Sequence, residues 1–114
     1  MSGLYLDNAA TTPVRREVLE AMAPLLTTTY GNPSSHHTVG ERAAAALDDA
    51  RRRVARVLGV RAGDVVFTSG GTEANNLAVK GIALAALQNT GARHVVTTPI
   101  EHESVLASID YLRR

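Results

Sequence analysis

Segments with helical periodicity alternate with short apolar runs along this chain, and this alternation restricts its fold more than any other feature. Residues 65–68 and 94–98 are rich in valine and threonine, as buried strands are, and residues 4–6 form a third strand candidate. Apolar side chains recur at helical spacing in four other regions: 14–25, 43–58, 77–85 and 105–112. This order of elements predicts an α/β protein with a mainly parallel sheet.

Local signals predict where two of these helices begin and end. Thr12 followed by Pro13 fits an N-cap and a first helical position. Thr38 and Glu41 have the spacing of a capping box at the start of the second helix. Gly59 directly follows the last apolar residue of that helix and predicts its C-terminal end, and the third helix is expected to end near Gly91.

The composition argues against several classes of function. A length of 114 residues suits one domain, and a net charge of +1 gives no reason to expect nucleic acid or a membrane surface as a partner. The chain has no cysteine, so it has no disulfide, no thiolate metal site and no cysteine nucleophile of its own. No basic stretch followed by an apolar one opens the sequence, and the expected location is the cytoplasm.

Three consecutive arginines at 51–53 have two interpretations. A basic run can bind nucleic acid. Asp48 and Asp49, however, lie four residues before Arg52 and Arg53, which is the spacing of ion pairs on one helix face. We therefore interpret the run as a solvated helix face.

The turn Ser69-Gly70-Gly71-Thr72 lies between a predicted strand and a predicted helix. A helix N-terminus has unpaired amides and a partial positive charge, and glycines let a phosphate approach the backbone closely. The hydroxyls of Ser69 and Thr72 add two donors. Neither the Walker pattern nor the dinucleotide pattern is present, so another phosphate ligand is indicated. An ordinary glycine turn with Ser69 as N-cap explains the same residues.

His102 follows the last predicted strand, at the sheet edge where open α/β proteins bind ligands. Its ring suits stacking on an aromatic cofactor or moving a proton. An exposed loop histidine is the alternative. A zinc site is not indicated, because His102 has no second histidine at helical spacing, and His36 and His37 are adjacent on a loop.

Four ordered motifs together resemble the class V, fold-type I pyridoxal-phosphate (PLP) enzymes, and most closely the cysteine desulfurases. The motifs are residues 5–13, 31–35, 67–76 and 101–102. The resemblance implies part of the fold-type I PLP-transferase large domain, an incomplete and mainly parallel sheet with helices. Residues 1–13 would be a segment that packs with the small domain, and residues 14–114 would be the N-terminal part of the PLP-binding large domain.

The resemblance also implies roles for single residues. Gly71 and Thr72, with Ser69, would hold the phosphate of PLP. His102 would stack on the pyridine ring and is a candidate proton relay. Asn32 would lie near the substrate carboxylate. No residue of this chain is expected to be catalytic in its own right beyond that relay.

The reaction implied is removal of sulfur from L-cysteine, which yields L-alanine and an enzyme persulfide for iron–sulfur clusters or thiolation. A homodimer and a sulfur-acceptor or scaffold protein are the implied partners. Selenocysteine lyases and aminotransferases of the same class remain alternatives, and so does a non-catalytic phosphate-ligand module or complementing piece.

Such enzymes need a lysine that binds PLP covalently and a cysteine that receives the sulfur, and in the family both lie C-terminal to the matched motifs. Lys80 is the only lysine of this chain. It lies eight residues beyond Thr72, which is about 12 Å along a helix, and away from the side where the phosphate would bind. We predict a surface or packing role for Lys80.

Overall fold

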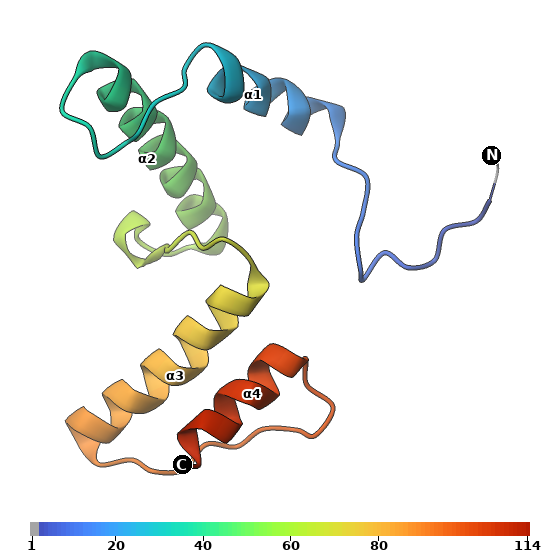
Figure 1. Cartoon of the computed structure of the whole chain (residues 1–114), viewed down its shortest axis with the longest axis vertical. Helices are drawn as coiled ribbons and strands as arrows, with labels where there is room; N and C mark the ends of the chain where they lie inside the picture. The colour runs from blue at the N-terminus through green and yellow to red at the C-terminus, as the bar shows by residue number, and fades with distance from the viewer. Residues whose placement is uncertain (1–2) are drawn as a thin grey trace. The chain divides into compact units, whose positions relative to one another are not determined.

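The computed structural model describes residues 3–114, which form two compact units divided between Val65 and Val66. Met1 and Ser2, the start of the predicted segment 1–13, lie outside the described residues. Figure 1 shows the order of the elements along the chain. The first unit holds α1 (Arg16–Thr27), α2 (Thr38–Leu58) and the short 3₁₀ helix η1 (Ala62–Asp64), and the second holds α3 (Gly71–Thr90) and α4 (Glu103–Leu112).

The predicted α/β class is wrong for the described residues, because residues 3–114 contain helices and no strand. The candidates at 4–6, 65–68 and 94–98 have no regular secondary structure. The predicted mainly parallel sheet of a PLP-transferase large domain is therefore not part of this structure.

The missing strands have a physical cause. A β-branched run favours an extended backbone, but a strand forms only when a neighbouring strand takes up its N–H and C=O groups. Val65 is extended, yet its amide donates to the carbonyl of Ala62 at 3.2 Å and its carbonyl accepts from Nε of Arg51 at 3.2 Å. Val96 is 96% exposed. Both runs have the composition of strands without the ladder that would make them strands.

The helix starts in the first unit differ from the prediction. Arg15, and not Thr12, is the N-cap of α1, so the helix begins three residues after Pro13. His37, and not Thr38, caps α2, and its Nδ1 accepts from the amide of Gly40 at 3.2 Å. The predicted end of α2 is confirmed, because Gly59 is in the left-handed region at φ 68° and its amide caps the helix.

The arginine run at 51–53 lies on α2, and the predicted ion pairs are present. Arg52 pairs with Asp48, and Nε of Arg53 lies 2.7 Å from Oδ2 of Asp49. All four side chains are about half exposed or more. The interpretation as a solvated helix face is confirmed for these two pairs, and exposed pairs of this kind contribute little to stability.

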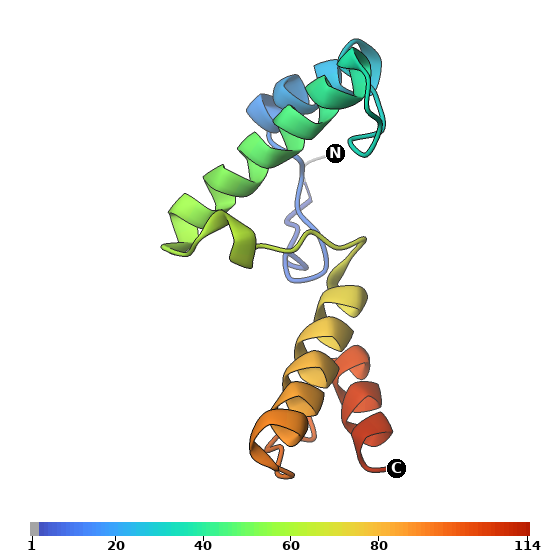
Figure 2. The ribbon, with the colours of Figure 1, turned by 90° about the vertical axis from the view of Figure 1, so that its left-hand side faces the viewer.

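In the second unit, α3 and α4 pack side by side and run in the same direction (Figures 1 and 2). Asn75 contacts Ser104 near the start of both helices, and Lys80 contacts Tyr111 further along both. The residues 91–102 return the chain between them, so both helix N-termini lie at the same end of the unit. Gly91 ends α3 in the left-handed region at φ 73°, as the sequence predicts.

Few side chains are buried within either unit. Ala55 is the one buried apolar side chain among the described residues, and Ser104 and Ser108 on α4 are buried polar ones. The most protected side chains of α4 are therefore polar. No helix in the described part of the chain is long and apolar enough to cross a membrane.

Candidate cofactor site at the N-termini of α3 and α4

The first turn of α3 presents amides that no described residue occupies. The amide of Ala74 is the first to bond back along the helix, to the carbonyl of Gly70 at 3.1 Å. The amides of Gly71, Thr72 and Glu73 precede it, so the helix itself offers them no acceptor. A Cβ added at Gly70 or Gly71 would meet nothing within 4 Å. The turn thus has free donors, a partial positive charge and open space, which fit a phosphate such as that of PLP.

The two predicted phosphate hydroxyls differ in their surroundings. Ser69 donates both its hydroxyl, at 2.6 Å, and its amide, at 2.8 Å, to Oε2 of Glu73. Thr72 leaves its hydroxyl without a partner among the described residues, while its carbonyl accepts from Asn76 at 2.8 Å. Because a hydroxyl has one proton, Ser69 has to leave Glu73 before it can donate to a phosphate. The Thr72 hydroxyl can donate to a phosphate without first breaking another hydrogen bond.

Glu73 therefore holds Ser69 at the start of the phosphate turn, and we call this pair of hydrogen bonds the Glu73 clamp. The hydrogen bond from the Ser69 hydroxyl and, to a smaller extent, the one from the Ser69 amide lower the pKa of the Glu73 carboxyl below its ordinary value. Both bonds favour the ionised carboxylate, which also lies in the first turn of α3, where the helix dipole stabilises negative charge.

Acidification is expected to open this clamp. Because the pKa of Glu73 is lowered in the folded state, the stabilisation that its carboxylate provides is complete above the unfolded-state pKa of about 4.3. It is lost as the pH falls through the folded-state pKa. After correction for intrinsic exchange, which itself slows as the pH falls, the protection factor of the Ser69 amide should therefore decrease on acidification, and Glu73→Gln should remove this pH dependence. Hydrogen exchange followed by mass spectrometry measures it. An unchanged protection profile in Glu73→Gln would contradict the clamp.

His102 lies at the same end of the second unit as the phosphate turn, as the N-cap of α4. Its Nδ1 accepts from the amide of Ser104 at 3.2 Å and lies 2.9 Å from the Ser104 hydroxyl oxygen. Asn75, one turn beyond Thr72 on α3, donates to the same oxygen at 2.8 Å. The structure thus links the predicted ring-stacking residue to the helix that carries the predicted phosphate donors. His102 itself is exposed.

Asn75 and Ser104 were not singled out by the sequence reasoning. Asn75 lies within the third motif and Ser104 directly after the fourth, but they are 29 residues apart. Their contact depends on how α3 and α4 pack, and no spacing in the sequence encodes that. A polar residue on the apolar side of each helix was the available signal.

Asn32 lies in the first unit, in the loop before α2. Its Oδ1 accepts from the amide of Ser34 at 2.9 Å, and its carbonyl accepts from the amide of Ser35 at 3.0 Å. The side chain therefore holds the loop before α2 in a turn. Its predicted role near the substrate carboxylate stays a prediction.

Lys80 is held by its neighbours. Its Nζ lies 2.6 Å from Oδ1 of Asn76 and 4.6 Å from the centre of the Tyr111 ring. The ammonium thus contributes a hydrogen bond and a cation–π contact between α3 and α4. These contacts agree with the predicted packing role.

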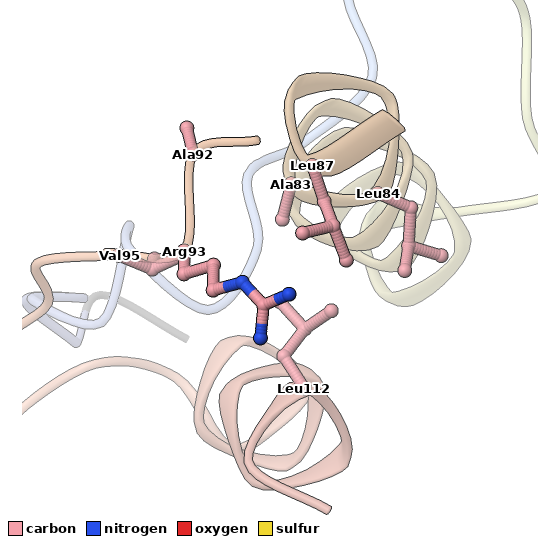
Figure 3. Close-up of a pocket in the computed structure, with 7 residues that line it drawn as sticks. All are labelled: Ala83, Leu84, Leu87, Ala92, Arg93, Val95 and Leu112. Carbon is pink, nitrogen blue, oxygen red and sulfur yellow. The ribbon is translucent and has the colours of Figure 1, made fainter. Parts of the chain in front are cut away.

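The pocket in Figure 3 lies at the other end of the second unit. Leu84 and Leu87 of α3 point toward Leu112 of α4, and the guanidinium of Arg93 reaches in beside Leu112. Its volume is about 240 Å³. Leu84 is twelve residues beyond Thr72, or about 18 Å along the helix. This pocket is therefore separate from the phosphate turn and takes no part in the site.

Comparison with known proteins supports the motif reading. The family model described as aminotransferase class-V matches residues 4–114. A cysteine desulfurase IscS from Dictyoglomus turgidum is 45% identical over 111 residues, and cysteine desulfurase 2 from Trichormus variabilis is 51% identical over 106 residues. These alignments cover 97% and 93% of this chain, but 28% and 26% of the relatives.

A solved structure of a NifS-like protein has a similar backbone. It superposes with a TM-score of 0.82 at 42% sequence identity, covering 93% of this chain and 28% of that protein. The chain therefore spans somewhat more than a quarter of the length of these three proteins. With a family match over residues 4–114 and cysteine desulfurases as relatives, the chain belongs to the aminotransferase class-V family and is a homologue of the cysteine desulfurases.

Proposed function

We propose that this chain provides the phosphate-binding turn and the ring-facing histidine of a PLP-dependent cysteine desulfurase. The observation that carries the proposal is that α3 and α4 begin at the same end of the second unit. The free amides of residues 71–73 lie in the first turn of α3, and Asn75 of the same helix contacts Ser104, which contacts His102. The substrate would be L-cysteine, and the products L-alanine and a persulfide on a cysteine outside this chain.

The residues of this chain bind and orient in the proposed reaction. The amides of Gly71 and Thr72 and the Thr72 hydroxyl hold the phosphate, and Ser69 adds a donor once it leaves Glu73. His102 would lie against the pyridine ring. When bound, PLP supplies an electron sink for the carbanion chemistry of its family. Asn32 orients the substrate carboxylate.

In this proposal, the lysine that binds PLP covalently and the cysteine that receives the sulfur do not belong to this chain. Lys80 is engaged by Asn76 and Tyr111, and the chain has no cysteine. A homodimer, a sulfur-acceptor or scaffold protein and a cytoplasmic location complete the proposal. They rest on the resemblance to the relatives.

Pyridoxine 5′-phosphate tests the phosphate site without the aldehyde that reacts with any free amine. We expect it to shift the amide resonances of residues 70–73, while pyridoxine, which lacks the phosphate, leaves them in place. Thr72→Val should weaken binding by about ten- to a hundredfold, since one hydrogen bond to a charged group is lost. Two-dimensional ¹H–¹⁵N spectra recorded during titration give both results.

Ser69→Ala is the matched control for Thr72→Val. Because the Ser69 hydroxyl already donates to Glu73, its loss should change affinity less than the loss of the Thr72 hydroxyl. Equal shifts with pyridoxine and its phosphate, or a larger effect from Ser69→Ala, would count against the assigned site.

A further inference from the structure

Two polar side chains, Asn75 and Ser104, connect the second turn of α3 to the ring of His102. The Nδ2 of Asn75 lies 2.8 Å from Oγ of Ser104, and this Oγ lies 2.9 Å from Nδ1 of His102. Ser104 is only 6% exposed, so its hydroxyl depends on these two side chains and not on water. We propose that Ser104, held by Asn75, is a positioning residue that keeps His102 in the neutral tautomer with its proton on Nε2.

The direction of each hydrogen bond follows from one fixed donor. The backbone amide of Ser104 donates to Nδ1 of His102 at 3.2 Å, and an amide N–H only donates, so Nδ1 carries no proton. The Ser104 hydroxyl therefore turns its own proton toward Nδ1. Its oxygen is then free to accept from Asn75, which places the Asn75 NH₂ toward it. The opposite orientation of the Asn75 amide would take the hydroxyl proton and leave two lone pairs facing each other.

A second histidine in this chain shows what the network adds. Nδ1 of His37 caps α2 by accepting from the amide of Gly40 at 3.2 Å. Within residues 3–114 no hydroxyl approaches that nitrogen in the way that Ser104 approaches His102. His37 therefore has one donor on Nδ1, whereas His102 has two, the amide and the hydroxyl of Ser104. The hydroxyl is in turn held by Asn75 of α3.

The consequence concerns the other ring nitrogen of His102. With Nδ1 engaged twice, the ring is held in one orientation and Nε2 is the only nitrogen that donates. The value of this arrangement for a cofactor ring rests on the proposed function, whereas the tautomer itself does not. The two ideas can therefore fail separately.

Long-range ¹H–¹⁵N spectra of the imidazole rings test the tautomer in the full chain. At about pH 9, well above the ordinary histidine pKa of about 6.5, His102 should show an unprotonated Nδ1 and a protonated Nε2. Ser104→Ala and Asn75→Ala should each raise the Nδ1-protonated population by about three- to tenfold, since each removes or releases a donor. Asn75→Asp should raise it further, because a carboxylate accepts the Ser104 proton.

Ser108→Ala is the control for a merely structural effect. Ser108 is fully buried on the same helix, and its hydroxyl donates to the Ser104 carbonyl at 2.8 Å without touching the ring of His102. This variant should weaken α4 and leave the His102 tautomer unchanged. A shift of the tautomer in Ser108→Ala as large as that in Ser104→Ala would overturn the proposal.

Diethyl pyrocarbonate gives a second measurement that does not depend on well-resolved spectra. It modifies the unprotonated ring nitrogen, which is the blocked Nδ1 in His102. Peptide mass spectrometry should therefore find modification slowest at His102, faster at His37, and fastest at His36 and His94, whose rings have no hydrogen-bond partner among residues 3–114. Ser104→Ala should speed His102 about three- to tenfold. Equal rates at all four histidines would overturn the proposal. The same result is expected if the contact between Asn75 and Ser104 does not form, so that case also overturns it.

Discussion

A mixture of this chain, PLP and L-cysteine is expected to release sulfide no faster than PLP and L-cysteine without the chain. The chain has no cysteine to receive sulfur, and its one lysine is held by Asn76 and Tyr111, about two turns along α3 from the phosphate turn. Lys80→Arg should therefore change nothing in this assay. Sulfide measured by a colorimetric assay gives the result, and release well above the PLP control would contradict our proposed division of roles.

The same residues should support the reaction when the rest of an enzyme is present. We expect activity from a chimera in which this chain replaces the matching region of the Dictyoglomus turgidum relative, to which it is 45% identical. In that chimera Thr72→Val should lower activity, and Lys80→Arg should leave it close to the parent level. Chimeras that fold and bind PLP but act on selenocysteine, and not on cysteine, would favour the alternative lyase assignment.

Gly40→Ala is expected to destabilise the first unit strongly. Gly40 is buried, and a Cβ there would overlap the carbonyl oxygen of Ser35 and lie 2.8 Å from that of Asn32. Both obstacles are backbone atoms, so the loop before α2 has to move. It would also disturb the amide that His37 caps. Overpacking of this kind costs about 1–3 kcal/mol.

Hydrogen exchange over residues 31–42 measures this effect locally. A cost of this size should speed exchange in the first turn of α2 roughly 5- to 100-fold, and α3 should be unaffected. Gly81→Ala provides the control, because a Cβ there meets nothing within 4 Å and the residue lies inside α3. That change should stabilise α3 by about 1 kcal/mol. Unchanged exchange at the start of α2 in Gly40→Ala would show that the loop yields without cost.

The helices were largely predictable because their hydrogen bonds are local. Periodicity located all four helical regions, and Gly59 and Gly91 marked two of the ends through the left-handed backbone that glycine adopts at no steric cost. The starts were less predictable. Arg15 and His37 are the N-caps where Thr12 and Thr38 were expected, because the loops before both helices, and not the capping propensity of one residue, decide where each helix begins.

The strands could not be predicted in the same way. The runs at 65–68 and 94–98 have the composition of strands, but a strand exists only with a partner, and no described segment pairs with either run. Composition reports which surface a side chain would fit. It does not report whether that surface is present in the chain.

The order and spacing of motifs along the sequence determined the family of this protein and singled out His102. The sequence also singled out Ser69, Gly71 and Thr72, because a helix N-terminus after a glycine turn has the same free amides in any fold. The packing of α3 beside α4 in the same direction decided what the sequence left open. It placed both helix N-termini at one end of the second unit and brought Asn75 to Ser104 across 29 residues. Contacts between helices depend on which faces meet in space, and that is settled only when the tertiary structure forms.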